Sequence, residues 1–160
     1  MQPTLIGRVI SRSMYGIIIT MALLAALENS SASAWAVALS IVATLFSISI
    51  AEAYTESIGV HIDKKTPIQD HERHKIFKES LYVFGGSSIP LFAFVAAGLG
   101  LWTLSTAFMI AKVASFILLF EYGYLYGRRS GRTRLGALKV GALNILLVSL
   151  IVAFKELVHV

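Results

Sequence analysis

Two carboxylates inside an apolar stretch are the residues of this sequence whose type and spacing best suggest chemistry. Glu52 and Glu56 lie four residues apart within Ser40–Gly59, so on a helix they project from one face. An ionised carboxylate in hydrocarbon costs on the order of several kcal/mol, and two neighbouring carboxylates repel each other. A bound cation, a shared proton or a basic partner would relieve both costs. The pair predicts a cation or proton site. The alternative is a headgroup position for Glu56 and one structural bond for Glu52.

Glu121 is a third carboxylate within an apolar stretch. With a helical rise of about 1.5 Å per residue, Glu52 lies about 26 Å from Trp35, and Glu121 lies about 30 Å from Leu101. The two are therefore predicted at a similar depth. Three carboxylates at one level would suit a hard or borderline divalent cation. The alternative is an interfacial Glu121 that pairs with the arginines following it in the sequence.

Lys112 is predicted near the middle of the bilayer, about 16 Å from the outer end of its helix. Nine residues separate it from Glu121, which places the two side chains on opposite faces of one helix. Lys112 could be a fixed counter-charge, a neutral amine or a residue of a subunit interface. A lysine at this depth is rare enough to indicate a specific role, so Lys112 is a possible accessory residue of the site.

Small residues and a proline interrupt the third apolar stretch, where Gly85–Pro90 reads GGSSIP. Pro90 removes the backbone donor that would bond the carbonyl of Gly86. Freed carbonyls and the hydroxyls of Ser87 and Ser88 can coordinate a cation, and interrupted helices at membrane depth often mark transport sites. The alternative is a packing kink, in which small residues let helices approach closely.

The remaining polar residues are weaker candidates. Asn144, in the last apolar stretch, is more typical of a hydrogen bond between helices than of a ligand. His71 and His74 can share a helix face and capture a metal weakly, although histidines in a charged segment are usually only solvated. The sequence has no cysteine, nucleophile–base motif, phosphate loop or dinucleotide fingerprint. We therefore expect neither an enzyme nor a resident cofactor; a divalent cation would be transported.

The composition places these residues in a membrane. Of the 160 residues, 56% are hydrophobic and 14% are charged, and the mean hydropathy is +0.74. A soluble domain usually has about 25% charged residues, so these charges are too few to cover a water-soluble globule. They are also clustered, which leaves long uncharged stretches typical of membrane spans. The net charge of +5 comes mainly from basic loops and does not indicate nucleic-acid binding.

Five transmembrane helices are predicted, and they form one all-α domain over residues 1–160. The predicted spans are Ser13–Leu27, Trp35–Gly59, Leu81–Leu99, Leu101–Tyr126 and Leu135–Phe154. The first span reaches about 20 residues when it is extended back past Arg12, whose side chain would snorkel to the interface. We therefore expect a span there and not a cleaved secretory signal.

The main polar segment, His61–Glu79, lies between the second and third spans. Thr66-Pro67 should break any helix, and Asp70 is expected to cap a short amphipathic helix that leads into the third span. The fold is thus a bundle of five transmembrane helices with a short amphipathic cytoplasmic segment.

Basic residues predict the orientation of the bundle. Nearly all lysines and arginines fall on one side when five spans are threaded, in the N-terminal segment, in His61–Glu79 and in Gly127–Arg134. The opposite loops, Asn29–Ala34 and Gly98–Gly100, have none, and Lys155 in the tail is the exception. The positive-inside rule places the N-terminus and the basic loops in the cytoplasm and the C-terminus outside. We expect a multi-pass protein of a bacterial inner membrane.

Five spans with the only large polar insertion between the second and third resemble the vacuolar iron transporter family. Three local patterns strengthen the resemblance. Ala51–Tyr54, followed by Ser57, is similar to the family's Gly-Glu-Tyr-Val-Ser segment at the end of its second helix. Gly85–Phe92 is similar to its small-residue, Ile-Pro-Leu third helix, and Tyr126–Gly141 to its fourth-to-fifth helix junction.

The resemblance implies a homodimer that moves a divalent cation of the iron or manganese type in exchange for protons. Glu52 would match the family's second-helix carboxylate. The family's first helix bears an Asn-Asp-Gly element, whereas the corresponding Met14–Ile17 has no acid, and the family's acid-rich cytoplasmic helices are reduced to His61–Glu79. We expect a divergent small member. The alternative is a non-transporting scaffold or accessory subunit whose polar residues hold the helices together.

Overall fold

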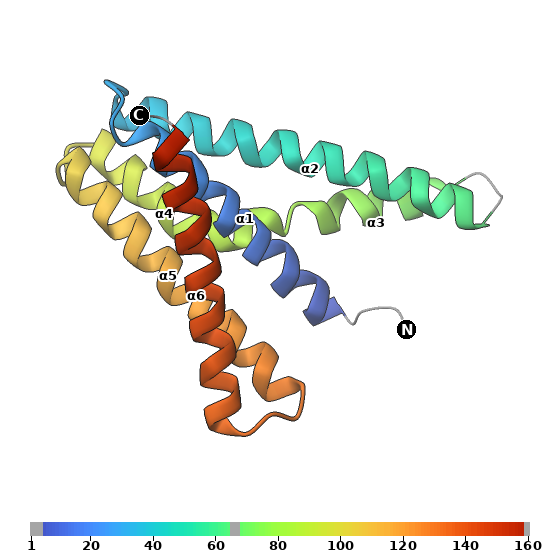
Figure 1. Cartoon of the computed structure of the whole chain (residues 1–160). Helices are drawn as coiled ribbons and strands as arrows, with labels where there is room; N and C mark the ends of the chain where they lie inside the picture. Colours follow the sequence, from blue (N-terminus) through green and yellow to red (C-terminus); the bar gives the residue numbers. More distant parts are fainter. Residues whose placement is uncertain (1–4, 65–67, 159–160) are drawn as a thin grey trace.

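The computed structural model describes residues 5–64 and 68–158, and this part of the chain is entirely helical apart from short turns. The helices are α1 (Leu5–Leu27), α2 (Ala34–Lys64), α3 (Asp70–Ser80), α4 (Val83–Gly98), α5 (Leu104–Arg129) and α6 (Arg134–Val158) (Figure 1). Five segments are long and apolar enough to cross a membrane, with α3 and α4 counted together as Asp70–Gly98. The predicted all-α membrane bundle of five spans is confirmed.

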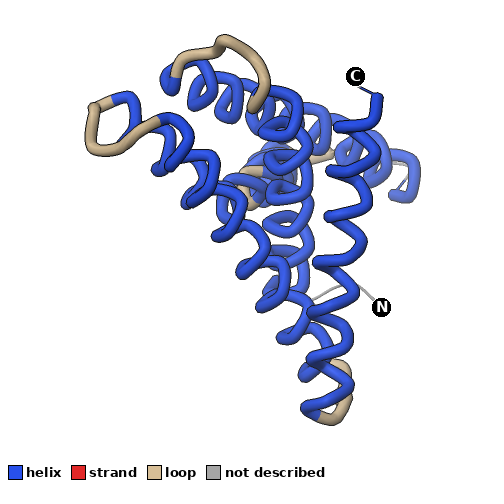
Figure 2. The backbone as a smooth tube through the Cα atoms, turned by 60° about the vertical axis from the view of Figure 1, so that its left-hand side comes forward, coloured by secondary structure: helices blue, strands red, loops and turns tan. Residues whose placement is uncertain are grey.

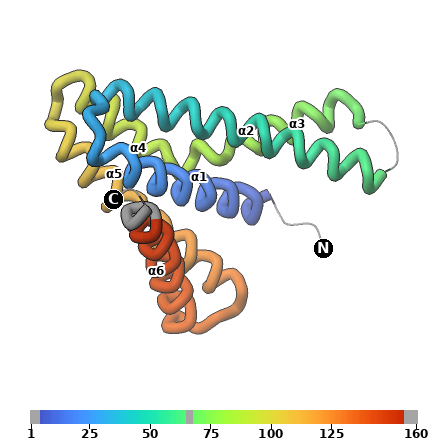
Figure 3. Tube along the Cα trace, turned by 45° about the horizontal axis from the view of Figure 1, so that its top comes forward, coloured from blue at the N-terminus to red at the C-terminus, as the bar shows by residue number. Residues whose placement is uncertain are grey.

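The helices diverge from one end of the molecule. Figure 1 shows α2 and α3 as one arm, the α5–α6 hairpin as a second arm, and the N-terminal half of α1 between them. The turn between α5 and α6 lies far from the α1–α2 and α4–α5 turns (Figure 2). Figure 3 shows the same divergence from another direction. The basic segments therefore lie at the diverging ends, as the threading of five spans requires.

Two buried apolar clusters hold the bundle together. In the larger one, which joins α1, α2, α4 and α5, the rings of Phe94 and Phe108 meet edge to face with centroids 4.8 Å apart. The smaller cluster, Ile17, Met21, Leu119 and Val148, joins α1 to the α5–α6 hairpin. Helix α1 contributes to both clusters and therefore links the two arms.

Helices α1 and α4 cross at backbone contact. A Cβ atom on Gly16 would lie 2.0 Å from the carbonyl oxygen of Val83, and one on Gly86 would lie 2.3 Å from that of Ser13. At the same crossing, the buried hydroxyls of Thr20 and Ser87 are hydrogen-bonded at 2.8 Å. Small residues and buried hydroxyls are typical of helix contacts in membranes.

The helix break predicted at Gly85–Pro90 is wrong, because α4 continues through Pro90. The irregular turn lies earlier, at Leu81 and Tyr82. Membrane helices tolerate proline when neighbouring helices and hydroxyl side chains stabilise the backbone. Ser88 donates a hydrogen bond to the carbonyl of Gly85 at 3.0 Å, so its hydroxyl bonds within its own helix. The small residues of this stretch therefore serve packing in this structure.

Several predicted boundaries also differ. Helix α2 continues to Lys64, beyond the predicted end of the second span at Gly59. Gln69, and not Asp70, is the N-cap residue of α3, and its N–H donates to the Glu72 carboxylate at 3.3 Å. This partner three residues on favours Gln69 over the predicted cap. Thr66 and Pro67, where a break is predicted, lie outside the described residues.

We predict that Gly16→Ala and Gly86→Ala each destabilise the protein by about 1–3 kcal/mol, because the added methyl overlaps the backbone of the facing helix. Thermal unfolding in a mild detergent measures the effect. Gly59→Ala is the matched control, since a Cβ there meets no atom within 4 Å, and it should be neutral or slightly stabilising. Equal melting temperatures for all three variants would contradict the backbone contact of α1 and α4.

Candidate functional site

Arg12 lies between the two carboxylates of α2. One of its Nη atoms donates a hydrogen bond to the Glu56 carboxylate, while its Nε lies 3.9 Å from Glu52 Oε2. That second distance is an ion-pair contact and too long for a hydrogen bond. The Arg12 side chain is 14% exposed. The Arg12 side chain therefore contacts the carboxylates of α2, which the sequence analysis did not predict, and its snorkelling to a membrane interface stays a prediction.

The charges of this group do not balance. One guanidinium faces two carboxylates, so the three side chains carry a formal charge of −1 when both glutamates are ionised. Among the described residues, Glu52 Oε2 and Arg12 Nη1 are buried and have no hydrogen-bond partner. Arg8 Nε, one turn away on α1, is the other such atom among the described residues. Burying a charge without compensation is expensive, so these unpaired atoms mark a strained polar region between α1 and α2.

A second ion pair lies one helical turn away. Arg8 Nη1 donates to Glu79 Oε2 at 2.6 Å, and the Glu79 side chain is only 4% exposed. Further along the α2–α3 arm, Lys64 pairs with Glu72. Neither pair was predicted. The four-residue spacing of Arg8 and Arg12 places both arginines on one face of α1, but it does not specify which acids of other helices they meet.

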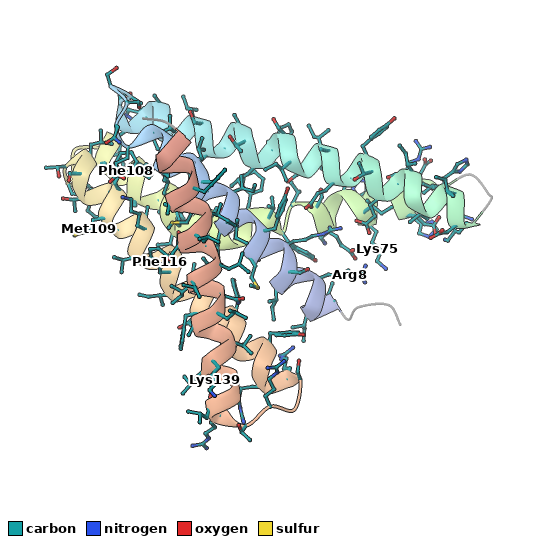
Figure 4. The ribbon with its side chains drawn as sticks, viewed as in Figure 1. Arg8, Lys75, Phe108, Met109, Phe116 and Lys139 are labelled. Atoms are coloured by element: carbon teal, nitrogen blue, oxygen red, sulfur yellow. The ribbon has the colours of Figure 1, made fainter. Side chains whose placement is uncertain are left out.

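A polar cleft of about 290 Å³ runs beside these ion pairs, between the α2–α3 arm and the start of α1. Its lining is Arg8, Glu56, Val60, Lys64, His71, Glu72, Lys75, Ile76 and Glu79. Figure 4 shows Arg8 and Lys75 at this side of the molecule. Glu56 lines the cleft and Glu52 does not, so the Glu56 carboxylate is the one that borders polar space. His71 is also in the lining, whereas His74 is exposed outside it.

The side of Glu52 away from this cleft is packed by protein. Ser49, one turn earlier on the same face of α2, is fully buried. Its hydroxyl lies 2.9 Å from the carbonyl oxygen of Leu45 and 3.2 Å from that of Ser80, and it donates to both. The group of Arg12, Glu52 and Glu56 therefore borders polar space along the α2–α3 arm, and buried residues separate it from the centre of the bundle.

Glu121 does not join the other two carboxylates. It lies exposed on α5, beside a small pocket with Phe120, Tyr124 and Leu125. Across residues 5–64 and 68–154, no three or more His, Cys, Asp or Glu residues gather so that they could hold a metal ion. The predicted three-carboxylate cluster is therefore wrong for this structure. Equal depth along two helices does not make their side chains face each other, and α4 packs between α2 and α5.

Lys112 has a partner that the sequence analysis missed. Its Nζ forms an ion pair with the carboxylate of Glu28, at the end of α1. Lys112 is about 12 Å from the start of α5, and the long aliphatic stem lets its ammonium reach this acid. Of the three roles predicted for Lys112, the counter-charge is the one that this contact fits. The available signal was Glu28, an acid at the outer end of the first span.

Asn144 makes the predicted kind of contact between helices. Its Nδ2 donates to the carbonyl of Leu119 at 3.5 Å, which links α6 to α5. Gly123 leaves the space for this side chain, since a Cβ there would lie 2.4 Å from Asn144 Nδ2.

No family model, curated protein or solved structure significantly matches the chain. The geometry of Arg12, Glu52 and Glu56 therefore carries the functional argument, and the resemblance to vacuolar iron transporters stays a prediction.

We predict unequal coupling energies for the two ion pairs that acids of α3 form, Arg8–Glu79 and Lys64–Glu72. A double-mutant cycle with Arg8→Gln and Glu79→Gln should give about 1–3 kcal/mol, because the Glu79 carboxylate is buried and accepts a charged hydrogen bond. The same cycle with Lys64→Gln and Glu72→Gln should give a clearly smaller coupling energy, because that pair is more exposed and solvent screens it. Unfolding free energies in detergent measure both. A stronger coupling for Lys64 and Glu72 would contradict the assignment.

Proposed function

We propose that this protein is a small membrane transporter that exchanges a cation for protons, and that Glu52 and Glu56 form its site. The observation that supports the proposal is the sharing of one arginine by two carboxylates. In the described part of the chain, the other three ion pairs each match one cation with one carboxylate.

The unbalanced charge gives this site an affinity for positive charge. In the low dielectric of a membrane protein, a net negative charge attracts a proton or a cation much more strongly than it would in water. A proton on Glu52 would neutralise the group while Arg12 stays bound to Glu56. A divalent cation would instead need both carboxylates and would displace the Arg12 guanidinium. Arg12 thus competes with the cation, and the proton leaves when the cation binds.

The polar cleft supplies a route from the basic side of the bundle to Glu56. Ser49 and the buried residues around it close the other direction, so a cation that reaches Glu56 could cross the bundle only after the helices rearrange. Helix α1 is suited to this role because it bears Arg12 and packs against both arms of the bundle. A shift of α1 would move the competing cation and alter the site at the same time.

The nature of the cation and the setting of the protein belong to the same proposal. The resemblance to vacuolar iron transporters favours a divalent metal of the iron or manganese type and a homodimeric assembly. The positive-inside rule favours a cytoplasmic N-terminus, cytoplasmic basic loops and an outside C-terminus, in a bacterial inner membrane. The cleft beside Glu56 would then open to the cytoplasm.

A non-transporting scaffold or accessory subunit is the second candidate. It is favoured by the dry polar contacts between helices, such as Thr20 with Ser87 and Ser49 with Ser80. In that case the pairing of Arg12 with the α2 carboxylates would serve only to fix α1 against α2.

Flux into proteoliposomes separates the two functions. We expect the wild type to take up Mn²⁺ or Fe²⁺ faster than empty liposomes, with opposite proton movement and a dependence on pH. Glu52→Gln should reduce the flux by about tenfold or more, because it removes the charge that attracts the cation. Glu121→Gln is the matched control and should retain the flux. Wild-type flux equal to that of empty liposomes would favour the scaffold, and equal flux for Glu52→Gln would reject this site.

A further inference from the structure

A separate groove lies between the N-terminal half of α1 and the α5–α6 hairpin. Its volume is about 740 Å³, which is within the usual range for small-molecule sites. Ile10 and Met14 of α1 form one wall, and Val140 and Leu143 of α6 form the other. Arg129 and Arg132, at the turn between α5 and α6, line the end of the groove on the basic side of the bundle.

The two arginines have no competing acid. The groove lining contains no Asp or Glu. In the part of the chain that the structure describes, neither guanidinium forms an ion pair with a carboxylate, and both residues are exposed. Guanidinium groups bind phosphate through paired charge-assisted hydrogen bonds. A long apolar wall that ends in two free arginines matches a molecule with an acyl chain and a phosphate at one end.

We propose that this groove binds one anionic glycerophospholipid from the leaflet on the basic side. An acyl chain packs along Ile10, Met14, Val140 and Leu143, and the phosphate region is bound by Arg129 and Arg132. The position fits, because the turn after α5 ends a membrane span, where headgroups lie. Basic pockets between transmembrane helices are a known kind of lipid headgroup site.

Charge complementarity favours a lipid over a second copy of this chain. The end of the hairpin carries Arg128, Arg129, Arg132 and Arg134 without an acidic residue between them. A copy that places its own hairpin end against this groove would bring like charges together, which is unfavourable at an interface. A lipid would also fill space that neither α1 nor the hairpin fills, and so connect the two arms of the bundle.

Lipid binding can be measured by native mass spectrometry of the protein in a neutral detergent. The probes are short-chain phosphatidylglycerol and phosphatidylcholine with identical chains, and glycerol 3-phosphate as the phosphate without chains. We expect the wild type to prefer phosphatidylglycerol, and Arg129→Gln/Arg132→Gln to bind it about tenfold more weakly, because charged hydrogen bonds are lost. Glycerol 3-phosphate should not bind measurably, since it lacks the chains that fill the groove.

Two variants make the test specific. Arg134→Gln/Lys139→Gln removes the same charge from the same hairpin outside the groove lining (Figure 4 labels Lys139), and it should keep the preference for phosphatidylglycerol. Leu143→Trp fills the groove and should weaken binding of both lipids. The proposal is overturned if Arg129→Gln/Arg132→Gln retains the preference, or if the control pair loses it equally. It is also overturned if Leu143→Trp changes only the oligomeric state, since the groove would then be an interface between copies.

Discussion

One arginine and two carboxylates oppose each other within the membrane-spanning helices, and the proposed function depends on this contact. Arg12 fixes α1 against α2 through Glu56, and its Nε remains within ion-pair distance of Glu52. Because one arginine faces two carboxylates, the contact holds α1 against α2 and still leaves one negative charge unpaired when both glutamates are ionised. A fully matched pair would be a purely structural contact. In the proposed function, this unbalanced charge attracts a proton or a metal ion, and Arg12, on the helix that joins both arms of the bundle, would compete with it.

The surrounding packing determines where this charge can be reached. Backbone contact at Gly16 and Gly86 and the bonds of Thr20 and Ser49 make the centre of the bundle tight and dry. The α2–α3 arm, by contrast, carries exposed charges along a polar cleft that reaches Glu56. The site is therefore open on the basic side and closed on the other, as one state of an alternating-access transporter would be. The groove beside α5 and α6 is apolar with arginines at its end, which is why we assign it to a lipid and not to the cation.

The sequence predicts the architecture well because the number of membrane spans depends on long apolar stretches, and the sequence has five of them. It also identifies the face shared by Glu52 and Glu56, since a four-residue spacing on one helix is local geometry. Relations between helices are a different matter. The depth of Glu121 can be estimated from the sequence, but the direction of its side chain around α5 cannot. Arg12 pairs with an acid of α2, and Lys112 pairs with Glu28 just after α1. Residue spacing within one helix does not specify such partners. The helix break predicted at Pro90 is wrong for a similar reason, because whether a membrane helix continues through a proline depends on the helices packed against it.

We propose that the group of Arg12, Glu52 and Glu56 exchanges a proton for a metal ion. The direct measurement is calorimetry of Mn²⁺ binding to the purified protein in two buffers that differ in ionisation enthalpy, which counts the protons released. We expect Mn²⁺ binding to the wild type to release close to one proton, and Glu52→Gln to lose this release together with most of the affinity. Mn²⁺ binding with no proton release, or the same release from Glu52→Gln, would contradict it.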